Sequence, residues 1–443
     1  MFEPRYLGCY DGLRKTVAKE KSVQKTRLKP VPCILTINGG SSSIKFALYR
    51  AYSPTTKILS GKIERIGLPG PKLTTKDSAQ NTQTQGIRAP NHRAAGRFLI
   101  RWLARHAGHT VVAGIGHRVV HGGTNFTESQ RITPKMLKEL RRLSPYDPEH
   151  LPSSIQLMEL FHQLDPDHLQ VACFDTAFHR QMPRVARLLP IPRRFDAKGV
   201  QRFGFHGLSY GFLMEELKRL AGPKAAKGRI IMAHLGNGAS LAAVRDGKSI
   251  DTSMGFTPCA GVPMSTRSGD LDPGLVWYLA RTERMTAKQF HEMVHHQSGL
   301  LGVSEISPDM RDLLARESRD VRAAEAVALF CYQVKKWIGS FAAALGGLDT
   351  LIFAGGIGEN AFEVRERICD NLAFLGLALD KKRNQTSAPI ISTPASRVTV
   401  RVIRTDEEVM IAKAVSRVLK ARSKNPNGIP PQSPGLRGTS YPG

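Results

Sequence analysis

The chain lacks the hydrophobic segments that mark membrane-spanning and exported proteins. No run within its 443 residues is both apolar enough and long enough to cross a bilayer. The best candidate, Gly339–Gly358, is rich in glycine and is interrupted by Asp349. The amino-terminus also lacks the apolar core of a secretory signal peptide. We therefore expect a soluble cytoplasmic protein, with a mitochondrial presequence as the weaker alternative.

Cysteine is also scarce and scattered. The chain has six cysteines, with no C-x-x-C pair and no histidine at zinc-finger spacing. This pattern argues against a disulfide framework or a structural zinc site, and it favours buried thiols in a reducing compartment. The six residues are Cys9, Cys33, Cys173, Cys259, Cys331 and Cys369.

Acidic residues are outnumbered by basic ones. The 37 Asp and Glu residues against 64 Lys and Arg leave a formal charge of +27. Such a surface attracts nucleotides, phosphorylated metabolites, nucleic acid or acidic lipid. No recognised nucleic-acid motif is present, so we interpret the excess as a solvated basic surface and expect neither a nucleic-acid nor a membrane partner. Hydrophobic residues, at 41%, suffice for globular cores.

The two ends of the chain differ in composition from the middle. Residues 1–31 are basic and contain few apolar positions, which predicts a flexible arm. Residues 422–443 are rich in Pro, Gly and Ser, which predicts a disordered tail. The length that remains suits two or three domains.

Between the tails, short strand patterns alternate with helical ones, which favours an α/β fold. The segment from Leu68 to Pro90 has no clear period and is expected to be irregular. The expected strands are Cys33–Asn38, Ile44–Tyr49, Lys57–Ile63, Val111–Val120, Gln170–Phe174, Arg229–His234, Ser240–Val244, Thr350–Phe353 and Val398–Ile403. The expected helical regions are His92–His106, Pro134–Leu143, Ser153–Leu164, Asp309–Ala344 and a final helix from Glu407.

Two segments of the chain share one layout. Both TINGGSSSIKFALYR and AHLGNGASLAAVRDG read as an apolar strand, a Gly/Asn/Ser turn and an alternating strand. Two such hairpins predict two domains of one ancestral topology that face each other across a cleft. The alternative is that any two hairpins look alike at this level of detail.

The Gly-rich loops lack the two commonest nucleotide-binding signatures. NGGSSSIK (Asn38–Lys45) has no G-K-[ST] that starts a helix, and GGIGEN (Gly355–Asn360) lacks the spacing of G-x-G-x-x-G. NGGSSSIK and HLGNGAS (His234–Ser240) nevertheless place glycines and hydroxyls between strands, where backbone N–H groups can approach an anion. GGIGEN follows a buried strand, which suits a nucleotide at a helix amino-terminus. Together the loops favour a phosphate clamp over plain tight turns.

Charged side chains occur at the expected strand ends. Asp175 in FDTAFH ends a buried strand, where α/β folds place their chemistry. Arg118 in GHRVVHGG and Arg267 in TRSGD are suited to bidentate binding of a carboxylate or phosphoryl group, with surface ion pairs as the alternative. A lone histidine such as His206 in RFGFHG is more often a hydrogen-bonded structural residue.

Two further strings read first as helix starts. PDMRDL begins a helix near Asp309. In TDEEVMIAK, Thr405 is the expected N-cap with Glu408 at capping-box spacing. Glu407 and Glu408 are then first-turn charges in the simplest interpretation.

Taken in order, these motifs resemble those of the acetokinase family, the acetate kinases, which belong with sugar kinases, Hsp70 and actin. The resemblance covers about residues 32–420. It implies an α/β protein with two RNase H-like (actin/Hsp70-type ATPase) domains around a central cleft, each a mixed sheet flanked by helices. The first domain would comprise residues 32–176 and 406–421, and the second, which also dimerises, residues 177–405.

The resemblance implies a reversible reaction of ATP with acetate that gives ADP and acetyl phosphate, with Mg²⁺ or Mn²⁺ as the cofactor and a homodimer as the assembly. A carboxylate is already ionised near pH 7 and needs no general base. It needs cancellation of charge, because one anion must attack another. Asp175, which would be a base in a sugar kinase, is therefore better read as orienting the metal.

The resemblance also assigns roles to individual residues. It implies a catalytic role for Asp175, His206 and Arg267, and carboxylate binding by Arg118, Val120, His150, Phe205 and Pro258. It implies that Asn38 and Glu407 hold the metal ion. It implies nucleotide or phosphate binding by Ser41, Ser43, Lys45, His234, Leu235, Gly236, Asn237, Gly238, Asp309, Met310, Arg311, Gly355, Gly356, Ile357, Gly358, Glu359 and Asn360.

One segment departs from the family pattern. Where family members usually have L-A-P-L-H-N-P, this chain reads LSPYDPEHLP, which places Glu149 beside His150. A glutamate in place of the usual pocket leucine would alter the acyl pocket. The preferred acid therefore stays open between acetate, propionate and another short acid, and a regulatory ATP-binding relative is a further alternative.

Overall fold

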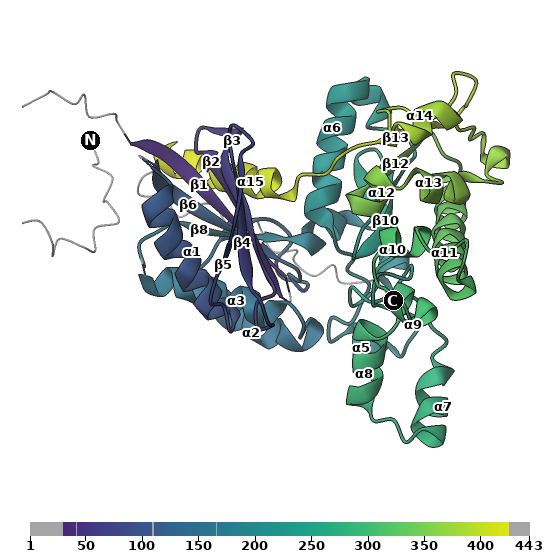
Figure 1. The fold of residues 1–443 in the computed structure, drawn as a ribbon, viewed down its shortest axis with the longest axis horizontal. Helices are drawn as coiled ribbons and strands as arrows, with labels where there is room; N and C mark the ends of the chain where they lie inside the picture. The colour runs from purple at the N-terminus through teal and green to yellow at the C-terminus, as the bar shows by residue number, and fades with distance from the viewer. Residues whose placement is uncertain (1–29, 41, 109, 165, 425–443) are drawn as a thin grey trace, which may run out of the picture.

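The computed structural model describes residues 30–424 apart from positions 41, 109 and 165. The chain forms two lobes, each built on a mixed β-sheet with helices against it (Figure 1). The basic arm and the carboxy-terminal tail that the sequence predicts lie almost entirely outside the described residues, as does Cys9.

The first lobe contains an eight-stranded sheet in the order β5-β4-β3-β2-β1-β6-β8-β7. Its centre consists of three antiparallel strands, β3-β2-β1, followed by β6 and β8, which run parallel to β1. The strands are β1 (Val31–Gly39), β2 (Ser43–Arg50), β3 (Ser53–Glu64), β4 (Lys72–Asp77), β5 (Thr82–Gly86), β6 (Thr110–Val119), β7 (Gln130–Arg131) and β8 (Gln170–Phe174).

The second lobe repeats this arrangement in a five-stranded sheet. Its order is β11-β10-β9-β12-β13, again with three antiparallel strands followed by two parallel ones. The duplicated topology that the two hairpins predict is therefore confirmed. The strands are β9 (Ile230–Leu235), β10 (Ala239–Arg245), β11 (Lys248–Thr252), β12 (Thr350–Ala354) and β13 (Thr399–Val402).

The prediction of an irregular segment between Leu68 and Pro90 is wrong. Strands β4 and β5 form an antiparallel hairpin that extends the first sheet beyond β3. In β4 only Leu73 and Thr75 are buried, and every residue of β5 is exposed. An exposed polar hairpin has no hydrophobic period, so sequence patterning could not detect it.

The helices cover the two sheets. In the first lobe α1 and α3 pack against one face, and α15 packs against the other (Figure 1). The helices are α1 (His92–His106), α2 (Pro134–Leu143), α3 (Leu151–Leu164), α4 (Arg184–Arg187), α5 (Arg193–Asp196), α6 (Gly207–Ala225), α7 (Gly274–Thr282), α8 (Ala287–His296), α9 (Gly299–Ser304), α10 (Met310–Leu314), α11 (Val321–Leu345), α12 (Gly355–Asn360), α13 (Phe362–Cys369), α14 (Lys381–Gln385) and α15 (Glu407–Lys424).

Alternation along β1 decides which helix each side chain meets. Leu35 and Ile37 belong to the core shared with α1 and α3, whereas Ile34 belongs to the core under α15. Period-2 alternation places successive side chains on opposite faces of a strand. Helix α15 thus covers the first sheet although it is the last element of the chain.

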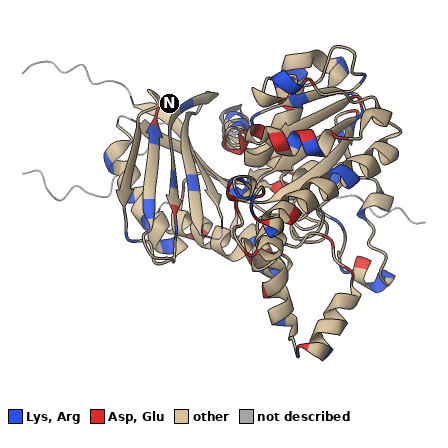
Figure 2. Cartoon of the chain, turned by 45° about the vertical axis from the view of Figure 1, so that its right-hand side comes forward, with Lys and Arg blue, Asp and Glu red and all other residues tan. Residues whose placement is uncertain are grey.

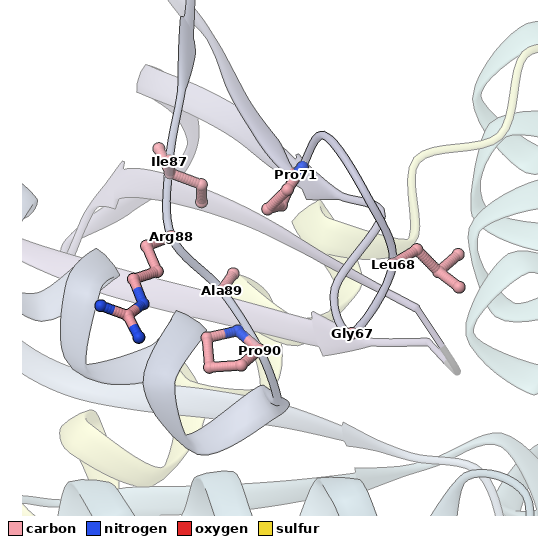
Figure 3. A pocket seen from close by; sticks show the side chains of 7 residues that line it. All are labelled: Gly67, Leu68, Pro71, Ile87, Arg88, Ala89 and Pro90. Atoms are coloured by element: carbon pink, nitrogen blue, oxygen red, sulfur yellow. The ribbon is translucent and has the colours of Figure 1, made fainter.

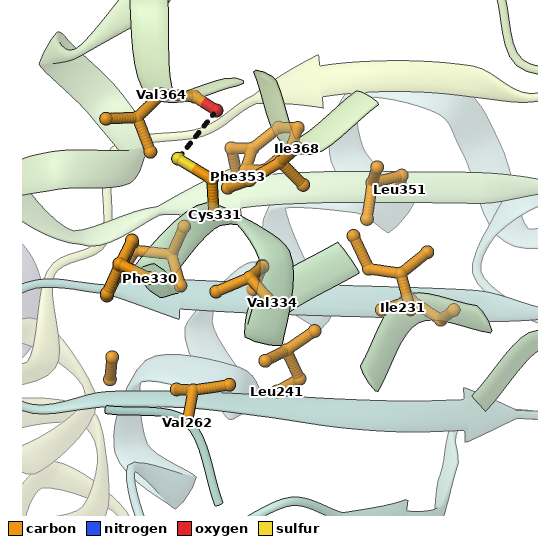
Figure 4. Close-up of a cluster of buried hydrophobic side chains, with 14 of the residues drawn as sticks. Ile231, Leu241, Val262, Phe330, Cys331, Val334, Leu351, Phe353, Val364 and Ile368 are labelled. Carbon is orange, nitrogen blue, oxygen red and sulfur yellow. Dashed lines mark hydrogen bonds between the residues drawn. The ribbon is translucent and has the colours of Figure 1, made fainter. Parts of the chain in front are cut away.

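The largest core of the second lobe lies between its sheet and α11 (Figure 4). Ile231 and Leu351 from the strands meet Phe330 and Val334 from α11, and all four are fully buried. Burying such side chains contributes roughly 1.5–3 kcal/mol each. This packing holds β9 and β12, whose carboxyl ends carry the predicted phosphate loops.

The expected helix start at Asp309 is confirmed, but the helical region that follows it and the cap of the last expected helix differ from the structure. The region from Asp309 to Ala344 is two helices, α10 and α11, and not one, because Asp320 caps a second start by accepting from the N–H groups of Arg322 and Ala323. At α15 the Asp406 carboxylate accepts from the Val409 N–H at 3.0 Å, whereas the Thr405 hydroxyl contacts Ser209. Asp406, not Thr405, is therefore the capping side chain.

Several composition-based expectations can be compared with the structure. The five cysteines among the described residues are buried and form no disulfide. None of the helices in that part of the chain has the length and apolar character that crossing a bilayer requires. Lys and Arg occur along strands of the first lobe and helices of the second and do not form a single stripe (Figure 2).

Buried histidines predict loss of stability in mild acid. Burial lowers the pKa of His117 and of His179 to about 4, so both stay neutral in the folded chain while the unfolded chain protonates near 6.5. Their contribution is complete above pH 6.5 and falls as the pH drops toward 4, by up to about 3 kcal/mol each. The unfolding temperature at pH 5 should be lower than at pH 7.5, and His117→Gln should reduce the difference. Equal unfolding temperatures in wild type would contradict this.

Candidate active site

A buried ion pair forms the centre of the first lobe's polar cluster. Arg118, at the end of β6, meets Asp175, which follows β8 directly; their Nη2 and Oδ2 atoms are 2.5 Å apart. The Nε atom of Arg118 donates to the same carboxylate at 3.0 Å. Because β6 and β8 are parallel neighbours, their carboxyl ends bring the two residues together. The Asp175 side chain is fully buried.

Two residues from distant parts of the chain complete this cluster. Arg118 Nη1 donates to the Asn38 Oδ1 atom at 3.1 Å, and the Asn38 amide donates to Glu407 Oε2 at 3.2 Å. Asn38 lies on β1 and Glu407 is the first residue of α15. Lys45 faces Asn38 across the β1–β2 hairpin. The predicted metal residues and the predicted carboxylate-binding arginine therefore share one network.

The charges in this network shift one another's pKa. Burial alone would lower the pKa of Arg118, but Asp175 and Glu407 raise it above its usual value. Burial would raise the pKa of Glu407, but Arg118, His234 and Lys45 hold it below its usual value. Burial together with Glu407 keeps the pKa of Asp175 raised against the effect of Arg118. Nearby positive charge would favour ionisation of both carboxylates.

The donor set suits a magnesium ion that is shared with a phosphate. Within the described part of the chain, no group of three His, Cys, Asp or Glu side chains could enclose a metal by itself. Mg²⁺ commonly takes one or two carboxylates and completes its shell with water and substrate phosphates. Asp175, Glu407 and the Asn38 amide oxygen are ligands of that kind, so the residues fit the ion.

The second lobe contributes a pair of stacked imidazoles. The rings of His206 and His234 are 4.3 Å apart at the centroids. His206 Nδ1 is 2.9 Å from the Ser240 hydroxyl, and His234 Nδ1 is 2.8 Å from the Ser209 hydroxyl. His206 adopts a left-handed backbone conformation (φ 57°) immediately before α6. Both rings are therefore fixed by hydrogen bonds.

His206 and Arg267 converge on one point beside Gly238. A Cβ atom built on Gly238 would lie 3.2 Å from His206 Nε2 and 3.7 Å from Arg267 Nη1. Burial and the neighbouring charges of His234, Arg118 and Arg267 lower the pKa of His206 well below its usual value. Arg267 donates to the Pro258 carbonyl at 3.1 Å, and burial lowers its pKa. The arrangement concentrates cationic groups and a neutral imidazole at a glycine-lined surface.

The two Gly-rich loops of the second lobe lie side by side. Gly355 (φ 76°) approaches the Leu235 carbonyl so closely that an added Cβ would be 2.6 Å from its oxygen. One Glu359 carboxylate oxygen accepts from the N–H groups of Gly355 and Thr405, at 2.9 and 3.1 Å. This carboxylate ties the GGIGEN segment to the chain that enters α15.

Some predicted nucleotide residues are not part of this network. Asp309 caps α10 and pairs with Arg311, whose side chain is 88% exposed. Met310 is buried in the core of the second lobe. Ser41 lies outside the described residues, and Ser43 begins β2. The remaining predicted loop residues sit at the ends of β9 and β12 or in α12, namely Leu235, Gly236, Asn237, Gly356, Ile357, Gly358 and Asn360.

The segment LSPYDPEHLP, which departs from the family pattern, contains a buried acid other than Glu149. Val120, Phe205 and Pro258 are buried as expected for an apolar lining. Glu149, however, pairs with His291 and His296 of α8, at 3.3 and 3.1 Å.

The buried acid of this segment is Asp147. Its Oδ1 atom is 3.0 Å from the Nδ1 atom of His150. Its side chain is 1% exposed. Sequence reasoning missed Asp147, although the departure from the family pattern marked the segment that contains it.

The cavity in Figure 3 lies in the first lobe, apart from these side chains. It has a volume of about 370 Å³, and Arg88 is the one charged residue among those that line it. No predicted site residue lines it. The lining residues are Gly67, Leu68, Pro71, Ile87, Arg88, Ala89 and Pro90.

Comparison with known proteins agrees with the motif order and the fold. The family model described as the acetokinase family matches residues 33–413. An acetate kinase of Rhodopseudomonas palustris (strain TIE-1) is 44% identical over 391 residues, which are 87% of this chain and 98% of that protein. A propionate kinase of Citrobacter rodentium is 43% identical over 396 residues, with 88% and 98% covered.

A solved structure gives the same result in three dimensions. The crystal structure of Porphyromonas gingivalis acetate kinase matches with a TM-score of 0.80 at 36% identity, covering 88% of this chain and all of that one. The resemblance that the motifs carry is thereby confirmed over nearly the whole folded body. The chain belongs to the acetokinase family.

Proposed function

We propose that the chain catalyses reversible, magnesium-dependent transfer of a phosphoryl group from ATP to a short-chain carboxylate, with acetate as the first candidate and propionate as the second. Relatives named as acetate kinases and as propionate kinases support both acids. The observation that carries the proposal is the convergence of Arg267 and His206 beside Gly238, with the charge of Arg118 close enough to lower the pKa of His206.

The chemistry requires positioning and charge cancellation. A carboxylate oxygen attacks the γ-phosphorus, the bond from that phosphorus to the ADP oxygen breaks, and no proton is transferred. The guanidinium groups of Arg118 and Arg267 balance the charges of the two anions and orient the acid. His206, held by Ser240, presents its Nε2 atom toward the same region.

Asp175 acts as a positioning residue in this scheme. Its carboxylate is bound by the Nε and Nη2 atoms of Arg118, which leaves it poorly placed to remove a proton. With Asn38 and Glu407 it would hold Mg²⁺, which when bound neutralises charge on the transferring phosphates. Mn²⁺ has similar ligand preferences and would serve as an alternative ion. We place the reaction in the cytoplasm, where free thiols and ATP coexist.

The arginines give the direct test. We expect Arg118→Ala and Arg267→Ala each to lower kcat about 10²-fold or more, because each removes a donor from the transition state. The assay traps the acyl phosphate with hydroxylamine in the presence of ATP, Mg²⁺ and acetate or propionate. Near-normal turnover in both variants would refute the proposed role of the two arginines. ATP binding without turnover of any short acid in wild type would instead indicate a regulatory nucleotide-binding protein.

The glycine beside His206 and Arg267 gives a finer test. Gly238→Ala would place a methyl group 3.2 Å from His206 Nε2, so the ring or the loop must shift by a few tenths of an ångström. We expect kcat to fall about tenfold with little change in unfolding temperature, because catalysis depends on such distances. Gly339→Ala in α11 is the matched control, since nothing lies within 4 Å of its Cβ position. Equal activity of the two variants would contradict the assignment.

We also propose a homodimer that forms through α7. This helix has no buried residue, and it exposes Val276, Trp277 and Tyr278, with Trp277 68% exposed. Exposed aromatic patches of this kind mark association surfaces. Light scattering should give the mass of a dimer for wild type and of a monomer for Trp277→Glu. Leu164→Glu, at an exposed position of the first lobe, should leave the dimer intact. A monomeric wild type would exclude this assembly.

A further inference from the structure

The segment LSPYDPEHLP, which departs from the family pattern, places the buried carboxylate of Asp147 on the acyl side of the site. One oxygen of this carboxylate has no hydrogen-bond partner among the described residues. Asp147 accepts from His150 through Oδ1, but its Oδ2 atom is buried and has no hydrogen-bond partner among the described residues. A buried acceptor without a partner destabilises the fold, and more so when it is charged. Asp175 and Glu407, two other acids near Arg118, are already bound by Arg118 and Asn38.

A second buried group, the imidazole of His121, lies on the same side of the site. His121 is fully buried, and its Nδ1 atom accepts from the Gly123 N–H at 2.9 Å. Burial lowers the pKa of His121 to about 4, with the Asp147 charge acting in the opposite direction. The neutral ring therefore carries its proton on Nε2. That atom forms no hydrogen bond of good geometry among the described residues, although the Phe256 backbone carbonyl lies near enough to raise the pKa of the ring.

Both groups lie beside the residues assigned to the acyl pocket. His121 follows Val120 in the chain, and its ring is 5.6 Å from the ring of Phe205. Tyr146, which precedes Asp147, packs against His121 at 5.4 Å. The charge of Asp147 influences the pKa of Arg118, of Arg267 and of His121. A hydrogen-bond acceptor, Asp147, and a donor, His121, therefore lie beside the apolar residues of the proposed acyl pocket.

A methyl or ethyl group cannot bond to either atom, whereas a hydroxyl group carries both the donor and the acceptor that the two atoms require. It can donate to Asp147 Oδ2 and accept from His121 Nε2–H. We propose that the acyl pocket of this chain favours a short-chain carboxylate that carries a hydroxyl group over its unsubstituted counterpart. The inference rests on the proposed function, because it names the class of acid that the same site takes. Discrimination of this kind can be large, since the analogue leaves buried polar atoms without partners.

Matched pairs of acids test the inference with the full-length enzyme. The acyl phosphate is trapped with hydroxylamine, and kcat/KM is compared for glycolate against acetate, and for lactate and 3-hydroxypropionate against propionate. We expect at least one hydroxy acid to exceed its counterpart about tenfold or more. Ratios of one or below in all pairs would overturn the inference and leave the proposed function intact. That result is expected if water molecules, and not the substrate, bond to Asp147 Oδ2 and His121 Nε2. No turnover of any acid would instead reject the proposed function.

Variants at Asp147 show whether this residue carries the preference. Asp147→Leu removes the acceptor, so the ratio within the favoured pair should fall to about one while turnover of the unsubstituted acid persists. Asp147→Asn keeps the shape and weakens the acceptor, which gives an intermediate ratio and a second variant should the leucine fail to fold. Glu149→Gln is the control, because its carboxylate points to α8 and the ratio should stay as in wild type. An unchanged ratio in both Asp147 variants would contradict the assignment.

Discussion

The buried ion pair between Arg118 and Asp175 is the interaction on which the rest of the site depends. It joins the carboxyl ends of two parallel strands, and through Asn38 it reaches Glu407 at the start of the last helix. Removing one partner would leave an uncompensated buried charge, which costs about 3–5 kcal/mol. The pair therefore fixes the guanidinium in orientation as well as in place. Chain segments that are hundreds of residues apart meet at this one group.

The duplicated hairpins explain why the two lobes contribute in a similar way. In the first hairpin Asn38 faces Lys45 across the loop, and in the second His234 faces Ser240 at the corresponding place. Each lobe thus presents polar side chains where a strand turns back, and each has parallel strands on the far side of that hairpin. A repeated topology gives two surfaces that can hold opposite ends of one long substrate. In the first lobe Asp175 is bound by Arg118 and Glu407 by Asn38, whereas Arg267 forms no ion pair within the described residues.

The sequence predicts this site well where local pattern carries the information. Asp175 could be placed at a strand end because the apolar run before it is unmistakable, and the two hairpins are defined by alternation and glycine. The β4–β5 hairpin could not be predicted, because its residues are polar and half of it is fully exposed. Asp147 could not be identified either. In D-P-E-H either acid could face solvent, and only tertiary packing decides that Asp147 is buried while Glu149 reaches α8.

In the proposed function, the balance of charge in the cluster links the divalent ion to the selectivity of the acyl pocket. Arg118, Arg267 and Lys45 carry three positive charges, and Asp175, Glu407 and Asp147 carry three negative ones when ionised, so the protein groups alone come close to cancelling. In the proposed reaction a triphosphate and a carboxylate would arrive as uncompensated anions, and a bound divalent ion would restore the balance. Asp147 is the member of this set whose second oxygen has no hydrogen-bond partner among the described residues. The charge of Asp147 repels the carboxylate of a substrate. A substrate with a hydroxyl group offsets this repulsion by donating to Asp147, so the repulsion selects for such substrates.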